Sequence, residues 1–437
     1  MYREFIAELQ MWKKNKHKKP LIISGARQVG KTWLMKEFGK QYYDSTVYLN
    51  FERNTALKSI FDDDLNPNRI VQALQLVQNV SILPSSTLLI FDEVQECPRS
   101  LTSLKYFCEE APQYDIVCAG LLLGIALHKG TSFPVGKVDM LHLYPMSFKE
   151  FLLANNETRL VQVLDACDFK MLNLVSSKLN DYLQRYYYVG GMPEVVNNYI
   201  IHKDFELVKK IQETIIYAYS NDFSKHTSAT ESTRINEVYK NISNQLVKEN
   251  KKFVYGFVRQ GARAKDYEVA LMWLKDCGLI HQVFRVKTPK IPLDFYKDNK
   301  AFKLFLSDVG LLSCLAGIGE DTVNQPNKSF VEFKGAIAEQ FVLQELKLHK
   351  DLRVYYYSNE RHTSEIDFLL DYKNNNIPVE VKSSINLRAK SLAAYNTMFS
   401  PKVSFRLSPA TYKKTETLID LPLYAVSCLP KMLEKNI

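Results

Sequence analysis

Apolar and polar residues follow two different periods over the first third of the chain. Continuous apolar runs predict strands that are covered on both faces, at residues 21–24, 47–52, 87–93, 115–120 and 138–143. Apolar residues at helical spacing predict helices at residues 4–12, 67–80 and 101–110, and another helix that begins at residue 33. Strands that alternate with helices favour a parallel α/β sheet.

A glycine-rich loop follows the first predicted strand. Residues 25–32 read G-x-x-x-x-G-K-T, and a helix is predicted directly after them. In this pattern the backbone N–H groups and the helix N-terminus face a phosphate chain. Lys31 is expected to reach the β- and γ-phosphates of ATP, and the Thr32 hydroxyl to bind Mg²⁺. The predicted nucleotide-binding residues are Gly25, Ala26, Arg27, Gln28, Val29, Gly30, Lys31, Thr32 and Trp33.

Such a loop needs a second strand that ends in acidic residues, because these residues complete the magnesium site, and residues 87–93 supply this strand. This apolar run ends in Asp92 and Glu93, at the carboxyl end where ligands bind in parallel sheets. Asp92 is expected to contact Mg²⁺ through water, and Glu93 is expected to polarise the attacking water.

The middle of the chain is predominantly helical. Residues 151–230 are predicted to form a helical lid or linker, in which Gly190-Gly191 marks a turn with positive φ angles. Residues 231–325 are predicted to form a winged-helix-like domain, because residues 253–286 show helix, turn, helix and strand in the order of a winged helix. Its helix at residues 267–276 would either enter a DNA groove or contact a protein, and both alternatives stay open. Asp308 is predicted to be a helix N-cap.

A second set of charged residues lies in the last part of the chain. Residues 326–437 are predicted to contain a helix (335–349), three strands (353–357, 365–371, 377–382), a helix (387–399) and a strand (403–407). The third strand carries Glu380-Val381-Lys382, and strand alternation places Glu380 and Lys382 on one face. Asp367, Glu380 and the Val381 carbonyl are oxygen ligands suited to Mg²⁺.

The same constellation suggests roles for two further residues. Lys382 would orient a water that attacks a phosphodiester, and Glu339 on the preceding helix would complete the site. An exposed cross-strand charge pair is the alternative for Glu380 and Lys382. The site is flanked by basic residues that suit contact with a nucleic-acid backbone, namely Arg361, His362, Lys373, Arg388 and Lys390.

Four stretches together resemble a group of bacterial and archaeal ATPases of the AAA+ superfamily. They are residues 25–32, the Asp92-Glu93 strand, residues 143–151 and residues 190–194. These ATPases carry a C-terminal domain of unknown function with a restriction-endonuclease-like core. The resemblance therefore implies an AAA+ P-loop ATPase domain at residues 1–150 and a restriction-endonuclease-like domain at residues 326–437.

The chain departs from the pattern of that group at one position. The group usually places a small hydroxyl residue after the glycine that follows the fourth strand, whereas Leu121 follows Gly120 in this chain. Leucine cannot donate a hydrogen bond to a phosphate, so either hydrolysis is slow or another residue takes this role, and nucleotide binding is not affected. Arg99, Arg159 and Arg185 are candidates for an arginine finger by charge alone, and surface solvation is the alternative for each.

Composition adds limits to these hypotheses. The 437 residues carry a net charge of +9, which permits contact with nucleic acid without requiring it. The seven cysteines are odd in number and never occur as C-x-x-C, so they are expected to be reduced core residues. A polar N-terminus and the lack of a long apolar run predict a cytoplasmic protein without a membrane segment.

Three functional hypotheses follow from the sequence. The first is an ATPase whose nucleotide cycle controls a Mg²⁺-dependent DNA endonuclease. The second is a nucleotide-dependent switch or scaffold whose C-terminal domain binds a partner without cutting it. The third is a ring-forming homo-oligomer that remodels its substrate, and it requires an arginine finger that the sequence does not identify.

Overall fold

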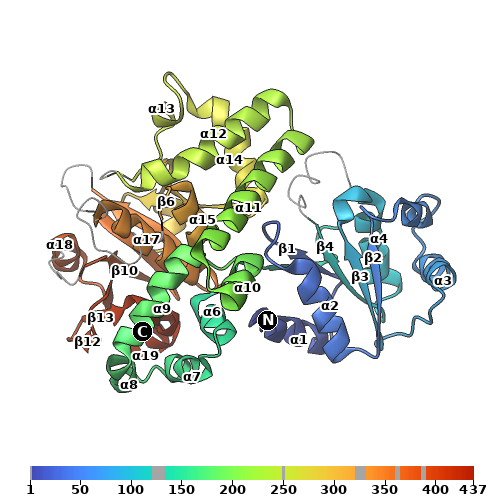
Figure 1. The fold of residues 1–437 in the computed structure, drawn as a ribbon, viewed down its shortest axis with the longest axis horizontal. Coiled ribbons are helices and arrows are strands. Elements are labelled where there is room, and N and C mark those ends of the chain that lie inside the picture. The colour runs from blue at the N-terminus through green and yellow to red at the C-terminus, as the bar shows by residue number, and fades with distance from the viewer. Residues whose placement is uncertain (1, 121–132, 249–250, 320–330, 360–364, 385–389) are drawn as a thin grey trace. The chain divides into compact units, whose positions relative to one another are not determined.

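The computed structural model describes residues 2–120, 133–248, 251–319, 331–359, 365–384 and 390–437 (Figure 1). The chain divides into two compact units. The first unit contains Tyr2–Tyr144 and Met272–Leu279, and the second unit contains Pro145–Leu271 and Ile280–Ile437. Among the described residues, no helix is both long and apolar enough to cross a membrane. All seven cysteines are free thiols; four of them are buried as expected for core residues, whereas Cys108, Cys167 and Cys314 are only partly buried.

The first unit contains a five-stranded parallel sheet, which confirms the predicted α/β class. The sheet order is β2-β3-β4-β1-β5, and every neighbouring pair is parallel. The strands are β1 (Leu21–Ser24), β2 (Ser45–Asn50), β3 (Thr87–Asp92), β4 (Asp115–Ala119) and β5 (Asp139–His142). All residues of β3 and β4 are buried, which explains why their sequences are continuous apolar runs.

Helices connect these strands where the sequence predicts them. They are α1 (Phe5–Lys14), α2 (Lys31–Tyr42), α3 (Pro67–Gln78) and α4 (Pro98–Glu110), with short 3₁₀ helices η1 (Thr55–Phe61) and η2 (Val94–Glu96). The core beside the sheet includes the rings of Phe51, Phe61 and Phe91, which pack edge to face with centroids 5.6–5.9 Å apart.

The second unit begins with a helical region, which confirms the predicted helical middle of the chain. Its helices are α6 (Phe148–Ala154), α7 (Thr158–Ala166), α8 (Phe169–Leu174), α9 (Ser176–Val189), α10 (Pro193–His202), α11 (Phe205–His226), α12 (Ala229–Leu246) and α13 (Tyr255–Val258). The next helix, α14 (Ala264–Asp276), begins in the second unit and ends in the first. Ser147 with Glu150 and Ser228 with Glu231 form capping boxes that fix the starts of α6 and α12.

The turn at Gly190-Gly191 needs its two glycines for different reasons. Gly190 has a φ of +74°, as predicted, whereas Gly191 does not have a positive φ. A Cβ on Gly191 would instead overlap the carbonyl oxygen of Met146. The Gly191 N–H donates to Asp308 Oδ2 at 2.6 Å, and the other oxygen of Asp308 accepts from Leu311 N at 3.0 Å. Asp308 is thus the predicted N-cap, of helix α15 (Val309–Leu315), and it also anchors this turn.

An eight-stranded mixed sheet occupies the rest of the second unit, in the order β12-β13-β11-β10-β9-β8-β6-β7. The strands are β6 (Ile280–Val286), β7 (Lys297–Leu306), β8 (Arg353–Ser358), β9 (Glu365–Tyr372), β10 (Asn375–Val381), β11 (Ser404–Ser408), β12 (Lys413–Lys414) and β13 (Leu418–Pro422). The elements that flank the C-terminal strands are α17 (Val331–Lys347), α18 (Lys390–Phe399), η5 (Leu423–Cys428) and α19 (Leu429–Asn436). The helix, three strands, helix and strand predicted for residues 326–437 follow in that order.

One sheet contains strands from both sides of the predicted boundary between residues 231–325 and 326–437. The β6–β7 hairpin follows α12–α14 in the winged-helix order, but β6 also pairs in parallel with β8. Val286 on β6 shares a hydrophobic cluster with Tyr355, Tyr357 and Ile366 of β8 and β9. Because pairing satisfies the backbone edge of β8 and buries these side chains, the two regions form one continuous sheet instead of two.

Candidate functional site

The loop between β1 and α2 has the backbone that its glycines predict. Gly25 and Gly30 have φ angles of +141° and +94°, and Gln28 between them has a φ of +66°. A Cβ on Gly25 would overlap the carbonyl oxygen of Leu143, whose own N–H donates to Ser24 O at 2.9 Å. The chain that follows β5 therefore lies so close to the loop that only glycine fits at position 25.

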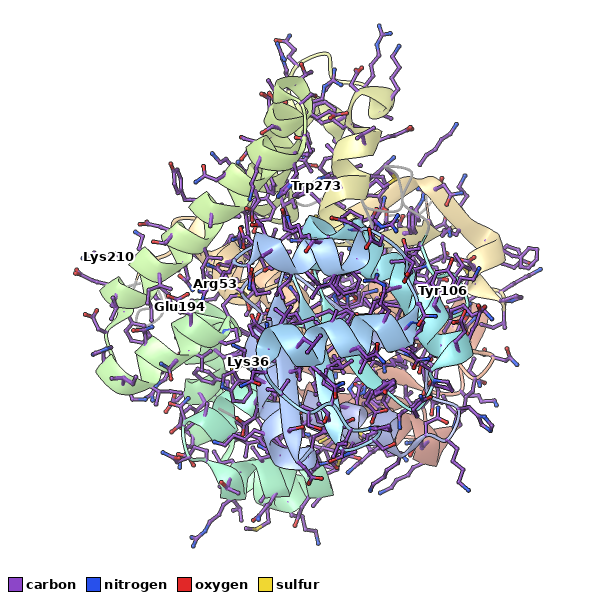
Figure 2. The ribbon with its side chains drawn as sticks, turned by 90° about the vertical axis from the view of Figure 1, so that its right-hand side faces the viewer. Lys36, Arg53, Tyr106, Glu194, Lys210 and Trp273 are labelled. Carbon is purple, nitrogen blue, oxygen red and sulfur yellow. The ribbon has the colours of Figure 1, made fainter. Side chains whose placement is uncertain are left out.

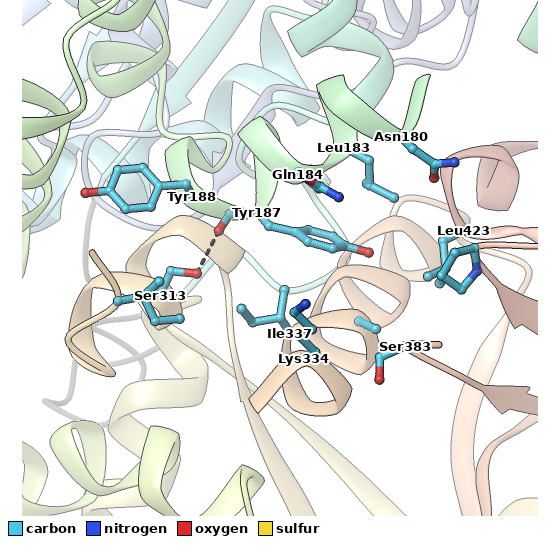
Figure 3. Close-up of a pocket in the computed structure, with 13 residues that line it drawn as sticks. Asn180, Leu183, Gln184, Tyr187, Tyr188, Ser313, Lys334, Ile337, Ser383 and Leu423 are labelled. Carbon is cyan, nitrogen blue, oxygen red and sulfur yellow. Dashed lines mark hydrogen bonds between the residues drawn. The ribbon is translucent and has the colours of Figure 1, made fainter. Parts of the chain in front are cut away.

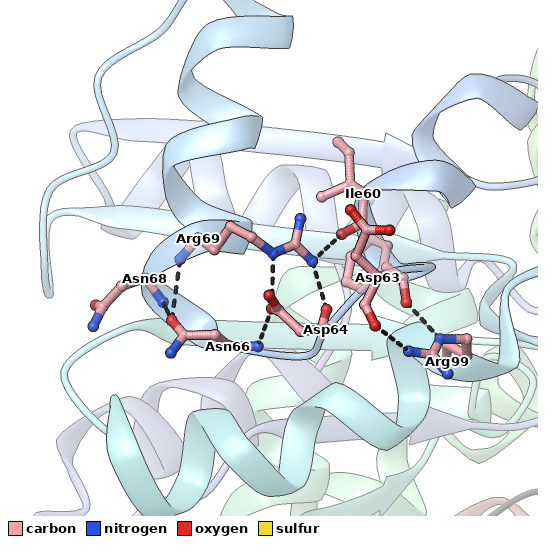
Figure 4. A network of polar contacts seen from close by, with 8 residues as sticks. Ile60, Asp63, Asp64, Asn66, Asn68, Arg69 and Arg99 are labelled. Atoms are coloured by element: carbon pink, nitrogen blue, oxygen red, sulfur yellow. Dashed lines mark hydrogen bonds and ion pairs between the residues drawn. The ribbon is translucent and has the colours of Figure 1, made fainter.

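The N-terminus of α2 is open to an anion. Gly30 occupies the N-cap position, no side chain of the described residues caps it, and the first turn contains no acidic residue. Helix α3 provides the contrast, because Asn66 Oδ1 accepts hydrogen bonds from the backbone of Asn68 and Arg69 (Figure 4). Uncapped N–H groups at the start of a long helix suit a phosphate group.

Lys31 lies within the loop that it follows. Its Nζ donates to the carbonyl oxygens of Gly25 and Ala26, at 2.8 Å each. Burial lowers the pKa of Lys31 to about 8, and the nearby Glu93 and Asp92 carboxylates oppose this shift. Among the described residues, the ammonium group donates its hydrogen bonds to carbonyl oxygens, and phosphate oxygens would be stronger acceptors.

The predicted magnesium residues lie together. Thr32 Oγ1 donates to Asp92 Oδ2 at 2.8 Å, which joins the start of α2 to the end of β3. The same carboxylate oxygen accepts from Tyr48 OH at 2.8 Å. Lys36, labelled in Figure 2, places its ammonium 3.6 Å from the centroid of the Tyr48 ring. The Thr32–Asp92 pair is the arrangement in which a hard cation is shared by a P-loop hydroxyl and an acidic strand.

Glu93 occupies an unusual backbone position beside this pair. Its φ of +55° is in the left-handed region, which is uncommon for a residue with a side chain. Gln95 Nε2 donates to Glu93 Oε2 at 2.6 Å, and burial raises the pKa of the carboxyl group. A backbone held in a sparsely populated conformation often marks a functional position.

Two residues near the loop were not indicated by the sequence pattern. His142, at the end of β5, has its Nδ1 3.0 Å from Ser24 Oγ, and burial lowers its pKa to about 4. Gly278 of the first unit has a φ of +72°, and a Cβ there would lie 3.2 Å from Ala26 N. His142 gave no signal because a single histidine in a short strand is usually structural.

Two of the three candidate arginines, Arg99 and Arg185, make contacts within their own unit, and the third, Arg159, is exposed to solvent. Arg99 donates from Nε to Phe61 O at 2.5 Å and from a terminal nitrogen to Asp63 O at 3.4 Å (Figure 4). Arg159 is exposed, and Arg185 lies over the ring of Tyr182 at 5.3 Å. Leu121 lies outside the described residues.

The predicted C-terminal residues are also brought together. Lys382 Nζ lies 2.7 Å from Glu380 Oε1, so the two side chains share one face as expected. Asp367 Oδ2 accepts from Val381 N at 2.8 Å, which ties the acid of β9 to the end of β10. Glu339 from α17 is close enough to Asp367 for the two carboxylates to interact electrostatically.

Two lysines that were not among the predicted residues complete this group. Lys303 on β7 is fully buried, 2.5 Å from Glu365 Oε1 and 3.9 Å from Glu339 Oε2. Lys251 forms an ion pair with Glu339. A signal for Lys303 existed, because it is the one charged residue in the apolar run of residues 301–306. We name Glu339, Glu365, Asp367, Glu380, Lys251, Lys303 and Lys382 the carboxylate–lysine cluster.

Burial and mutual repulsion disfavour the charged form of two carboxyl groups in the cluster. Burial, followed by repulsion from Asp367, raises the pKa of Glu339 to about 7 and that of Glu380 to about 8. One oxygen each of Glu339 and Glu380 is buried without a hydrogen-bond partner among the described residues. A cation would satisfy these oxygens. In the present geometry, however, no three His, Cys, Asp or Glu side chains of the described residues are placed to hold a metal.

The surroundings of the cluster are only partly described. Of the flanking basic residues, Lys373 and Lys390 are exposed. Arg361, His362 and Arg388 lie outside the described residues.

The fold and site of the first unit define a P-loop ATPase domain. A family model described as an AAA domain matches residues 17–152. Two models described as domains of unknown function (DUF8612 and DUF4143) match residues 180–322 and 334–424. The chain thus carries an AAA domain of the ATPase type, followed by two domains of unknown function.

Solved structures give more distant likenesses. A Walker-type ATPase of Pyrococcus abyssi aligns over 72% of this chain and 95% of that chain, with 13% identity and a TM-score of 0.43. The ORC2 protein of Aeropyrum pernix in its ADP form covers 74% and 94%, with 15% identity and a TM-score of 0.34. The ORC1 protein of Aeropyrum pernix in complex with DNA covers 73% and 93%, with 12% identity and a TM-score of 0.28. At these scores the likenesses carry no functional argument. A comparison with curated proteins finds no match.

Proposed function

We propose that the first unit binds and hydrolyses ATP with Mg²⁺, and that its nucleotide state controls nucleic-acid binding by the second unit. The observation that carries the first part is the 2.8 Å hydrogen bond between Thr32 and Asp92, beside an uncapped helix N-terminus. These features fit a nucleoside triphosphate, because they place N–H donors, an ammonium group and hard oxygen ligands around one point.

Each residue of the P-loop site has a distinct role in this proposal. Lys31 and the first N–H groups of α2 would bind the phosphates, and Thr32 with Asp92 would hold magnesium. Glu93 would orient and polarise the attacking water. Bound magnesium would offset the negative charge that develops on the transferred phosphoryl group.

ATP turnover by the full chain tests this site. Lys31→Ala is expected to lower turnover by about 100-fold or more, because one preorganised charge at the phosphates is lost. Lys40→Ala is the matched control, since Lys40 is an exposed lysine on the same helix. Equal turnover in wild type and Lys31→Ala would show that the P-loop is not the site of hydrolysis.

For the second unit we propose Mg²⁺-dependent cleavage of nucleic acid at the carboxylate–lysine cluster. Asp367, Glu380 and Glu339 would hold the cation, and Lys382 would orient the attacking water. The buried, unpartnered oxygens of Glu339 and Glu380 support a cation at this position. Cation binding would require Glu339 to leave its ion pair with Lys251, because the carboxylates are not otherwise gathered around one point.

Cleavage is tested with linear, supercoiled and branched DNA plus Mg²⁺, with and without ATP. Asp367→Asn is expected to abolish cleavage, because it removes one carboxylate charge while retaining the size of the side chain. Lys382→Ala is expected to abolish cleavage without affecting ATP binding. Cleavage that survives in Asp367→Asn would place the active site elsewhere.

A second candidate function is a nucleotide-dependent switch that binds nucleic acid without cutting it. The observation that favours it is the ion pairing of Lys303 and Lys251, which already neutralise Glu365 and Glu339 without a metal. Under this proposal DNA binding would change with ATP, and no cleavage would occur in Mg²⁺. Electrophoresis of the same DNA incubations therefore separates the two functions. Wild type either cleaves the DNA or only lowers its electrophoretic mobility by binding.

A further inference from the structure

A cavity of about 290 Å³ lies within the second unit (Figure 3). Helices α9, α15 and α17, the chain after β10, and η5 contribute its walls. This volume lies just below the range of about 300–1,000 Å³ that is typical of ligand pockets. It therefore suits one small ring system and is too small for a segment of double helix.

The polar groups of this cavity converge from two helices. Asn180 and Gln184 line it from adjacent turns of α9, and Lys334 lines it from α17. The Tyr187 ring also lines it, with the hydroxyl directed toward Leu423 in Figure 3. That hydroxyl is buried and has no hydrogen-bond partner among the described residues. A buried donor without a partner is costly, so a ligand atom at this point would be stabilising.

The remaining lining is mostly apolar, apart from Ser313 and Ser383. Leu183, Ile337, Ala338 and Leu423 are all nearly inaccessible to solvent. The described residues that line the cavity include one lysine and no acidic residue. An uncharged planar group with hydrogen-bonding edges, attached to an anion, matches these walls, the two amides and the single ammonium group.

The cavity adjoins the carboxylate–lysine cluster along the chain. Ser383, which lines the cavity, directly follows Lys382, and Ala338 directly precedes Glu339. Two separate segments of the chain thus contribute residues both to the cavity wall and to the cluster.

We infer that this cavity receives a single nucleobase from nucleic acid bound at the cluster, an inference that rests on the proposed function of the second unit. Asn180 and Gln184 would hydrogen-bond to the base edge, because an amide offers both a donor and an acceptor. The Tyr187 hydroxyl would meet a second polar atom of the base, and Lys334 would face the attached phosphate. Enzymes that hold one base out of the stack use a pocket with polar contacts to the base edge.

A fluorescent base reports whether the pocket is filled. Single-stranded DNA that contains 2-aminopurine is bound to the Asp367→Asn protein in EDTA, so that no cleavage interferes. The base is expected to change its fluorescence on leaving the stack. Gln184→Trp, an exposed position at the cavity, is expected to remove this change by filling the space, and Tyr187→Phe is expected to weaken it by about 5-fold. Asp181→Ala is the control, as an exposed residue of α9 that does not line the cavity.

Four deoxynucleoside 5′-monophosphates separate this inference from the proposed function. They are titrated against a Lys31→Ala protein, so that the P-loop does not contribute. One outcome is that DNA does not bind, whereas a monophosphate binds to the protein and no longer binds after Gln184→Trp. This result would support the base pocket and would refute nucleic-acid binding at the cluster. If DNA binds and Gln184→Trp responds like wild type, the pocket inference is overturned. Absence of both kinds of binding overturns both.

Discussion

His142 makes the stability of the first unit depend on pH in a predictable direction. Burial, with a smaller contribution from Lys31, lowers its pKa from 6.5 to about 4. Between these values the unfolded chain binds a proton that the folded chain does not, so stability falls as the pH falls from 6.5 to 4. A shift of about 2.5 units at 1.36 kcal/mol per unit gives about 3 kcal/mol. This is an upper bound because the ring is only partly buried.

The effect can be measured selectively because of where the tryptophans lie. Trp12, Trp33 and Trp273 are the three tryptophans of the chain, and all belong to the first unit. Urea unfolding followed by tryptophan fluorescence therefore reports that unit. We expect wild type to lose up to about 3 kcal/mol more than His142→Asn between pH 6.5 and 4, since asparagine does not titrate. His17→Asn is the matched control at an exposed position.

The decisive quantity is the difference between wild type and variant at each pH. If wild type and His142→Asn lose stability in parallel, the imidazole is not kept neutral by the fold. The argument from burial would then be wrong. A His17→Asn protein that loses stability less steeply than wild type would point to a general charge effect.

Three further predictions concern other parts of the chain. Gly25→Ala should abolish nucleotide binding and destabilise the first unit, because its Cβ would overlap a backbone carbonyl. Gly136→Ala, at a φ of +71° in open space, should lower the free energy of unfolding by only about 1 kcal/mol. Nucleotide titration and urea unfolding compare the two variants. Asp308→Ala should cost the second unit about 3 kcal/mol through a lost cap and an unpaired N–H, and calorimetry showing no change would exclude this role. The pKa of Glu380 is raised, so wild type should lose stability as the pH rises from 4.5 to 8, and Glu380→Gln should lose less over that range in the same calorimetric assay.

The P-loop site could be predicted well because its parts are either contiguous or brought together by a simple rule. Residues 25–32 are one segment, and the carboxyl ends of parallel strands meet at one edge of the sheet, so Asp92 had to lie near Thr32. Tyr48 and His142 were missed because they lie on strands that carry no motif. Their roles depend on which strands become neighbours, and this is not local information.

The C-terminal cluster shows the same division. Glu380 and Lys382 were placed on one face by strand alternation alone, and the structure agrees. Lys251 and Lys303 come from segments assigned to another domain, because the pairing of β6 with β8 could not be read from local patterns. A lysine in an otherwise apolar strand was nevertheless a usable sign of a buried ion pair, because an isolated buried charge is too costly.

The assignment of Met272–Leu279 to the first unit has a consequence for how the chain can be divided. The polypeptide crosses between the units three times, after Tyr144, Leu271 and Leu279, and the second crossing falls inside helix α14. A fragment that ends at residue 144 would lack Gly278, whose backbone lies next to Ala26 of the P-loop. We therefore expect the isolated fragment to be a poorer ATPase than the full chain, and we expect it to recover activity when a peptide spanning residues 264–286 is supplied. Because helix α14 belongs to both units, we also expect a nucleotide-linked movement of one unit to be transmitted through this helix and not through a flexible linker.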